Sequence, residues 1–265
     1  MISMHHGCFE YRQKEPIFSD LNFQLTKGET LSILGPNGVG KTTLVKCLLG
    51  FQRLQSGEVQ FEGQSLEKIP LKQFFRRVSY VPQARNVVFP YSVLDMVLLG
   101  RASAIGLNAR PSKEDVERAI TAIRRVGIAP LMHQSTRQIS GGQLQLVLIA
   151  RAIVNDPEVM ILDEPESNLD MKNQLIILDL MEQLREELGL TTIINTHYPN
   201  HALRLGGKAL LLGSGNRRDF GNTKDLINHE TIRAYFHVDS QMVEWQDAAK
   251  THQRIFPVGL AKEAV

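Results

Sequence analysis

The sequence predicts an α/β fold built around a mainly parallel core sheet. Short apolar runs of strand length alternate with helical patterns along the chain, which is typical of strands joined by helices. A glycine-rich turn follows the first of these runs. The length of 265 residues suits one large domain, or a main domain with an inserted subdomain, and the hydrophobic content of 43% is enough to bury a substantial core.

The expected elements follow from the periodicity of the apolar residues. A helical subdomain is expected at about 84–155, where strand signals fade. Gly213-Ser214-Gly215-Asn216 has the residues of a turn between two late strands and predicts a hairpin. The last segment, 238–265, has no clear pattern. We expect core strands at 30–34, 78–81, 159–162, 192–195 and 209–212, and helices at 42–50, 113–126 and 172–188.

Composition excludes several classes of protein. The formal charge of +2 indicates no general attraction to nucleic acid. Cys8 and Cys47 are too few for a disulfide framework or a zinc site, so a reducing cytoplasm is the simplest environment. The first residues lack the pattern of a secretory signal, and no run approaches the roughly 18 apolar residues of a spanning helix. Any membrane role is therefore expected to require a partner.

Residues 35–42 match the pattern GxxxxGK[ST] in full. Glycines let the backbone wrap closely around phosphate oxygens with successive N–H groups pointing inward. The following helix adds roughly half a positive charge at its N-terminus. We expect Lys41 to reach the β- and γ-phosphates and the Thr42 hydroxyl to ligate Mg²⁺. The pattern predicts that the chain binds a nucleoside triphosphate through Gly35, Pro36, Asn37, Gly38, Val39, Gly40, Lys41, Thr42 and Thr43.

Two acids, Asp163 and Glu164, end the apolar run at 159–162. Open α/β folds hold their ligands at this carboxyl edge of the sheet. Asp163 is expected to help hold Mg²⁺ through water, because Mg²⁺ sheds its hydration reluctantly. Glu164 is expected to polarise the attacking water, and general-base assistance of this kind contributes roughly 10²–10⁴-fold. The alternative is an acidic cap before a helix that starts at Pro165; the phosphate loop upstream favours a hydrolase site.

The stretch Ser140-Gly141-Gly142-Gln143 opens an apolar helical run but holds no acid, base or nucleophile. A small-molecule kinase or GTPase has no use for such a tetrad. The phosphate loop, this tetrad and the acidic pair follow one another along the chain in this order. With these motifs the chain resembles the ATPase subunits of ABC transporters, and the resemblance covers nearly its whole length. The resemblance implies a single ATPase domain over 1–265, with a P-loop NTPase core, an N-terminal antiparallel β part, the helical subdomain at about 84–155 and a tail, 238–265, of unknown role.

The resemblance assigns roles to residues outside the phosphate loop. Tyr11 matches the aromatic residue that stacks on adenine, and Gln83 matches the glutamine of the loop between core and helical subdomain, a contact for the metal or the attacking water. Asp170 ends the loop after the catalytic acid and is expected among the nucleotide-binding residues. His197 matches the switch histidine, which implies a hydrogen bond to the γ-phosphate. The implied catalytic residues are Glu164, His197 and Gln83, and the implied Mg²⁺ ligands are Thr42, Gln83 and Asp163.

The resemblance also explains why the tetrad contains no catalytic group. Its serine hydroxyl and the backbone N–H groups of the helix N-terminus are donors for an anion. In the family they do not touch the ATP of their own phosphate loop but close over the γ-phosphate bound by a second, facing copy. Two subunits pack head to tail with two ATP molecules between them. We therefore expect a homodimer in which Ser140, Gly141, Gly142 and Gln143 complete the site of the other chain.

The sequence departs from the family pattern at several positions. Glu166 stands where a small hydroxyl residue is usual and adds negative charge beside the acidic pair, which would raise the local acid pKa values if it faces them. Tyr198 follows the switch histidine where an acidic residue is common. Leu144 and Leu146 replace polar or basic residues after the tetrad. None of these changes removes an expected catalytic group.

The segment 89–101 resembles the corresponding stretch of importers for metal chelates: siderophore iron, haem, cobalamin and, in some members, molybdate. This implies a many-helix permease as partner, reached through a groove near 83–100, and indirectly an extracytoplasmic binding protein. The expected location is the cytoplasmic face of the membrane, through the permease, with no nucleic acid bound. The alternative is a soluble ABC ATPase of translation or repair. Those usually carry two ATPase domains or a long coiled coil, and this chain has one phosphate loop and no long heptad segment.

Overall fold

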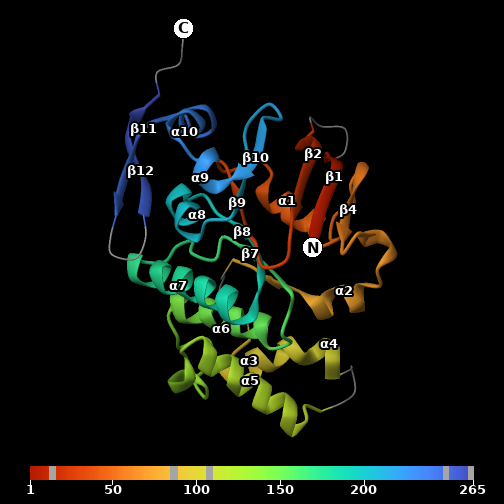
Figure 1. Ribbon diagram of the computed structural model, residues 1–265. Coiled ribbons are helices and arrows are strands. Elements are labelled where there is room, and N and C mark those ends of the chain that lie inside the picture. Colours follow the sequence, from red (N-terminus) through yellow and green to blue (C-terminus); the bar gives the residue numbers. More distant parts are fainter. Residues whose placement is uncertain (12–15, 84–88, 106–109, 247–250, 262–265) are drawn as a thin grey trace. The chain divides into compact units, whose positions relative to one another are not determined.

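The computed structural model describes residues 1–11, 16–83, 89–105, 110–246 and 251–261 (Figure 1). The chain forms two compact units. Unit 1 comprises Met1–Lys68 and Ile193–Val265, and unit 2 comprises Ile69–Thr192. None of the helices within the described ranges is long and apolar enough to cross a bilayer.

Unit 1 begins with an antiparallel sheet in the strand order β2-β1-β4-β5. Its members are β1 (Ile2–Phe9), β2 (Phe18–Leu25), β4 (Ser56–Phe61) and β5 (Gln64–Ser65). In β2 the side chains of Phe18, Leu21, Phe23 and Leu25 are buried while most residues between them are exposed, as expected when one face of the sheet covers a core. Ile2 of β1 pairs with Leu25. This sheet confirms the predicted N-terminal antiparallel part.

The second sheet of unit 1 carries the order β10-β9-β3-β8. β3 (Thr30–Leu34) is buried throughout and runs parallel to β9 (Lys208–Leu212). β10 (Arg218–Asn222) returns antiparallel, and the Gly213 N–H donates to the Arg217 carbonyl at 2.9 Å, so the predicted hairpin at 213–216 is confirmed. β8 spans Thr191–Asn195. The helices of unit 1 are α1 (Lys41–Leu48), α8 (Pro199–Leu205), α9 (Thr223–Leu226) and α10 (His229–Phe236), with a 3₁₀ turn at Leu66–Lys68.

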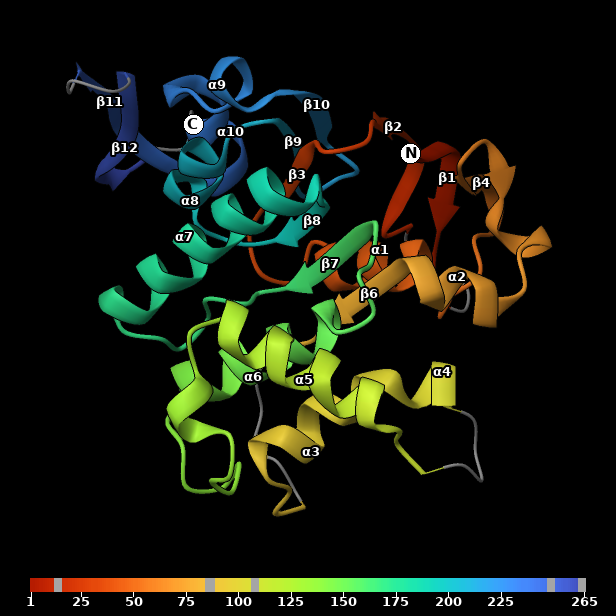
Figure 2. The same ribbon diagram turned by 60° about the horizontal axis from the view of Figure 1, so that its bottom comes forward.

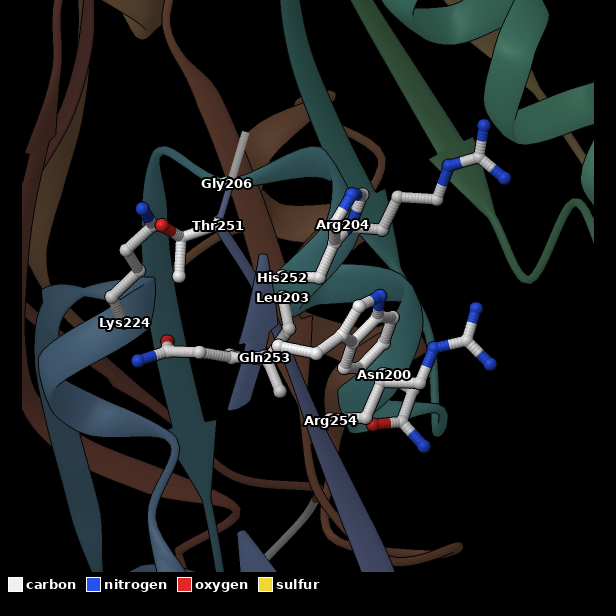
Figure 3. A pocket seen from close by; sticks show the side chains of 10 residues that line it. Asn200, Leu203, Arg204, Gly206, Lys224, Thr251, His252, Gln253 and Arg254 are labelled. Atoms are coloured by element: carbon white, nitrogen blue, oxygen red, sulfur yellow. The ribbon is translucent and has the colours of Figure 1, made fainter. Parts of the chain in front are cut away.

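The tail without a sequence pattern forms an antiparallel hairpin of β11 (Val238–Gln246) and β12 (Thr251–Leu260). Ile255 of β12 is buried in a cluster with residues of α8 and α10. The Asn200 side chain donates to the Ile255 carbonyl at 3.0 Å and accepts from its N–H at 2.8 Å, so α8 holds the strand by an amide. A cavity of about 610 Å³ lies beside the hairpin; in Figure 3 the side chains of Arg204 and Arg254 extend away from Lys224, so these cations do not converge.

Unit 2 combines two parallel strands with a group of helices. β6 (Val78–Val81) pairs in register with β7 (Val159–Asp163), whose residues are all buried. Figures 1 and 2 show α3, α5 and α6 lying against one another. The helices are α2 (Leu71–Arg77), α3 (Val93–Leu98), α4 (Ala102–Ile105), α5 (Lys113–Arg125), α6 (Gly141–Ile153) and α7 (Met171–Leu188), with 3₁₀ turns at Leu99–Arg101 and Ala129–Leu131.

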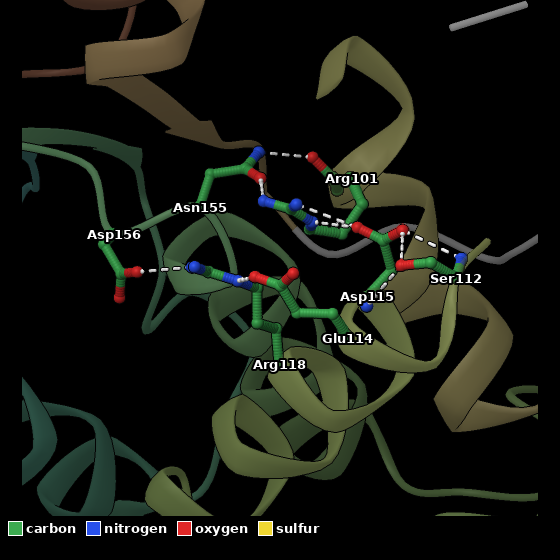
Figure 4. Close-up of polar contacts among 8 residues, drawn as sticks. Arg101, Ser112, Glu114, Asp115, Arg118, Asn155 and Asp156 are labelled. Carbon is green, nitrogen blue, oxygen red and sulfur yellow. Dashed lines mark hydrogen bonds and ion pairs between the residues drawn. The ribbon is translucent and has the colours of Figure 1, made fainter. Parts of the chain in front are cut away.

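A polar network ties three helical segments of unit 2 together (Figure 4). The Arg101 guanidinium donates to Asp115 at 2.8–2.9 Å and to the Asn155 side chain at 2.8 Å. Asn155 in turn donates to the Gly100 carbonyl at 2.5 Å. Asp115 also accepts from the hydroxyl and N–H of Ser112, which caps α5, and these bonds together with Arg101 lower the pKa of Asp115 to about 2. The network fixes the segment after α3 to the start of α5 and the end of α6.

Candidate nucleotide site

The phosphate loop joins β3 to α1 through residues with positive φ. Gly35, Gly38 and Gly40 have φ of 149°, 85° and 101°. A Cβ on Gly35 would stand 2.2 Å from the Leu212 carbonyl oxygen of β9, and one on Gly40 would stand 2.1 Å from Ile17 Cγ2. Only glycine fits this backbone path. The loop is therefore closed against β9 on one side and the segment before β2 on the other.

Lys41 occupies the start of α1 and is 5% exposed. Its Nζ donates to the carbonyls of Gly35 at 2.7 Å and Pro36 at 2.9 Å, so the ammonium is held by the loop itself. The first turn of α1 has no acidic residue. The helix N-terminus and the ammonium together give this end of β3 a positive field, which favours a bound anion.

Thr42 is tied to the end of β8. The buried Asn195 side chain donates to Thr42 Oγ1 at 3.5 Å, and the Thr196 N–H donates to the Ile33 carbonyl at 3.0 Å. Asn195 was not among the residues predicted from the sequence, although a polar residue that ends an apolar strand run was the available signal. His197 follows two residues later, half-buried and in the same unit as the phosphate loop.

Tyr11 lies beside α1 with its ring 40% exposed. Its hydroxyl is 3.3 Å from Thr43 Oγ1, and its ring meets Phe9 edge to face with centroids 4.9 Å apart. The ring is thus held at its hydroxyl and by Phe9 while part of its surface stays exposed. The placement suits the predicted adenine contact, next to the helix that carries the phosphate loop.

In unit 2 the acidic pair stands at the end of β7. The Asp163 side chain is buried and accepts from the Tyr80 hydroxyl at 3.4 Å. Glu164 Oε2 accepts from Gln83 Nε2 at 3.4 Å and from the Ser167 hydroxyl at 2.9 Å. The predicted Gln83 and Glu164 are thus brought together. Tyr80 and Ser167 were not predicted as partners, although both lie in the stretches that the motifs singled out.

Glu164 adopts a left-handed backbone with φ of 48°. For a non-glycine residue this conformation costs roughly 1–2 kcal/mol. Such strain persists only where the surrounding structure over-determines it, and it clusters at functional sites. Here the turn after β7 aims the carboxylate at Gln83 and Ser167 instead of continuing the strand direction.

The tetrad forms the first turn of α6. Ser140 is the N-cap: its Oγ accepts from the Gln143 N–H at 3.2 Å, and Gln143 Oε1 accepts from the Ser140 N–H at 2.9 Å. A Cβ on Gly142 would stand 2.5 Å from Asn173, whose N–H and side chain donate to Asp170. The tetrad and the loop that ends at Asp170 are therefore packed together within unit 2. The capping role of Gln143 was not foreseen.

The available donors fit Mg²⁺. Thr42 supplies a hydroxyl in unit 1, and Asp163 and Gln83 supply carboxylate and amide oxygens in unit 2; oxygen is the ligand that Mg²⁺ prefers. Within the described part of the chain no group of three or more His, Cys, Asp or Glu residues could hold a metal.

Comparison with known proteins now decides between phosphate-loop families. Residues 18–167, more than half of the chain, match the model of the ABC transporter family, and this stretch contains the phosphate loop, the tetrad and both acids. The chain belongs to the ABC transporter family. This ABC ATPase is 35% identical over 253 residues to the molybdate import ATP-binding protein of Haemophilus influenzae, an alignment that covers 95% of this chain and 94% of that protein.

Solved structures agree with this assignment. A metal-chelate type ABC transporter in an inward-facing conformation is similar to this chain with a TM-score of 0.86 and 34% identity, over 97% of this chain and 96% of that one. A dimeric ATP-binding cassette in a post-hydrolysis state, bound to ADP and phosphate, is similar with a TM-score of 0.71 and 27% identity, over 83% and 98%. The predicted P-loop NTPase fold and the predicted ATPase family are confirmed.

We predict that Gly35→Ala lowers the unfolding midpoint more than Gly38→Ala. Both positions have positive φ, so the left-handed backbone costs each variant roughly 1–2 kcal/mol. Only Gly35 faces a backbone carbonyl, 2.2 Å from the added Cβ, whereas nothing lies within 4 Å at Gly38. Thermal unfolding of both variants checks this. Equal midpoints would show that the loop is not closed against β9.

Proposed function

We propose that this ABC ATPase hydrolyses ATP in a head-to-tail homodimer and thereby powers a membrane permease that imports a metal chelate or molybdate. The observation that supports the dimer best is the tetrad: a capped helix N-terminus with anion donors, in the same chain as a complete phosphate loop. Two similar proteins, a molybdate import ATP-binding protein and a metal-chelate type ABC transporter, support the class of cargo.

ATP binding is assigned to the residues of unit 1. The backbone N–H groups of residues 35–40, the N-terminus of α1 and Lys41 would take the phosphates, and Tyr11 would stack on adenine. Thr42, Asp163 and Gln83 would hold Mg²⁺, which when bound neutralises phosphate charge. Asn195 keeps the Thr42 hydroxyl in place from β8.

Proton removal from the attacking water is assigned to Glu164. Its Oε2 is oriented by the Gln83 amide and the Ser167 hydroxyl, and the strained backbone fixes its direction. A carboxylate held by donors accepts the proton of water as the water oxygen attacks the γ-phosphorus, and ADP leaves. His197, at the end of β8, is assigned a hydrogen bond to the γ-phosphate.

The second copy supplies the remaining donors. Ser140, Gly141 and Gly142 carry the N-terminal N–H groups of α6, and this turn has no acidic residue. These groups would close over the γ-phosphate bound by the facing chain, with Asp170 and its neighbours at the contact between the two copies. A dimeric cassette bound to ADP and phosphate is among the similar structures, which supports this arrangement.

We predict that Glu164→Gln retains ATP binding and lowers the steady turnover by roughly 10²–10⁴-fold, because the amide cannot take the proton. The variant should accumulate as an ATP-bound dimer, which light scattering with and without ATP measures. Ser167→Ala, which removes a donor but keeps the carboxylate, serves as the matched control and should lose much less activity. Turnover of Glu164→Gln near that of the wild type would refute the assigned base.

We predict that Ser140→Arg and Lys41→Ala are each nearly inactive and that a mixture of the two regains hydrolysis. In a head-to-tail pair, the intact phosphate loop of one variant meets the intact tetrad of the other, which restores one complete site. Monomeric Ser140→Arg should still bind ATP in an equilibrium titration. A tetrad that acts on its own chain's ATP would give no recovery on mixing and a loss of monomer binding.

The permease contact is assigned to the segment at 83–100, of which residues 84–88 lie outside the described ones. Three apolar side chains there are exposed, namely Phe89 (64%), Tyr91 (38%) and Leu99 (45%). The rings of Phe89 and Tyr91 lie 6.1 Å apart. The network of Arg101 and Asp115 anchors the far end of this segment. The protein would thus sit at the cytoplasmic face of the membrane through its permease, and an extracytoplasmic binding protein would deliver the cargo.

We predict that the protein fractionates with membranes only when its permease is co-expressed, and that Phe89→Asp abolishes this association. Leu71→Asp is the matched control, because Leu71 of α2 is similarly exposed (59%) but lies outside the segment. Uptake assays with molybdate and ferric chelates then identify the cargo. Recovery with ribosomes or damaged DNA instead of membranes would favour the soluble class of ABC ATPase.

A further inference from the structure

Three aromatic rings follow one another in the segment after β8. The ring centroids of His197 and Tyr198 are 4.1 Å apart, and those of Tyr198 and His201 are 4.7 Å apart, each pair with an interplanar angle of 37°. All three side chains are half-buried and belong to unit 1. Tyr198 therefore stands between two imidazoles, one of which is the assigned switch histidine.

The backbone around Tyr198 is fixed on both sides. Its N–H donates to Thr196 Oγ1 at 3.1 Å, and its carbonyl accepts from the His201 N–H at 3.0 Å. Pro199 begins α8 and restricts the preceding residue to an extended conformation, which Tyr198 adopts with φ −105° and ψ 99°. Thr196 in turn is bonded to Ile33 of β3. The backbone of Tyr198 is thus linked through Thr196 to the strand that leads into the phosphate loop.

We propose that Tyr198 is a positioning residue that holds the imidazole of His197 in the orientation needed for the γ-phosphate. The proposal rests on the proposed function of His197. A ring packed against the imidazole limits its rotation, as aromatic pairs prefer tilted or offset contacts at these distances. The His201 ring also contacts the tyrosine. The ring does this without a charge, whereas the acidic residue common at this position would place a carboxylate beside an anionic ligand.

A small displacement of a positioned group is enough to slow a reaction strongly. If Tyr198 acts through His197, its removal should affect the chemical step and leave the binding of ATP by the phosphate loop nearly intact. If Tyr198 only packs α8 onto the core, its removal should lower the stability of the fold and affect both quantities or neither. Measuring kcat and KM separately therefore distinguishes the two roles.

The test uses the full chain with Tyr198→Leu, Tyr198→Phe and His197→Ala, and the double variant His197→Ala/Tyr198→Leu. We expect Tyr198→Leu to lower kcat about tenfold with less than a threefold change in KM for ATP, and Tyr198→Phe, which keeps the ring, to stay within about threefold of the wild type. In the His197→Ala background, Tyr198→Leu should have no further effect on kcat, because its action passes through the missing imidazole.

Several results would overturn the proposal. One is an unchanged kcat in Tyr198→Leu. Another is a tenfold loss of kcat when Tyr198→Leu is added to His197→Ala. An unchanged kcat in His197→Ala would remove the assigned role of the histidine and the proposal with it, whereas the mixing experiment with Ser140→Arg tests the dimer independently. Thermal unfolding accompanies each variant; if Tyr198→Leu does not fold, Tyr198→Met takes its place in the same comparison.

Discussion

The close approach of Gly35 to the carbonyl of Leu212 is the constraint on which the nucleotide site depends. A Cβ at position 35 would stand 2.2 Å from that oxygen, so the chain can leave β3 along this path only if residue 35 is glycine. This path sets the start of α1, and thus the place of Lys41 and Thr42. Thr43, on the same helix, anchors Tyr11, and Asn195 links Thr42 to β8. A single backbone contact in unit 1 therefore determines where the residues proposed to contact phosphate and adenine can lie.

In unit 2 the requirement is different: the carboxylates of Asp163 and Glu164 must keep a fixed orientation near apolar surroundings. A carboxylate that leaves water needs donors, and an unsatisfied one is costly. Tyr80 supplies a donor to Asp163, and Gln83 and Ser167 supply donors to Glu164. These contacts also offset the left-handed backbone at Glu164. The groups that hold Glu164 are thus taken from the loops after β6 and β7, where ligands of open α/β sheets lie.

The sequence predicted those parts of the molecule that local chemistry determines. The strand at 30–34, the turn at 213–216 and the phosphate loop were read from glycines and apolar runs, and the helix expected at 42–50 differs from α1 by one or two residues at each end. The hairpin of β11 and β12 was missed, because the Asn200 amide and the burial of Ile255 hold it, contacts between residues far apart in sequence. Asn195 and Tyr80 were missed as site partners for the same reason, whereas Ser167 lies only three residues from Glu164 and its bond depends on the turn that follows β7.

Ser140 of the tetrad has a role in its own fold and, in the proposed dimer, a second role toward the other chain. Ser140 Oγ already accepts the Gln143 N–H as an N-cap. A serine hydroxyl has one donor and two acceptor sites, so an accepted bond does not use its proton. The same oxygen can cap α6 and donate to a phosphate, and the bond from Gln143 fixes the oxygen in place beforehand. A residue that could only accept, such as aspartate, would cap the helix equally well but would repel the triphosphate of the facing chain in the proposed dimer, which favours serine at this position.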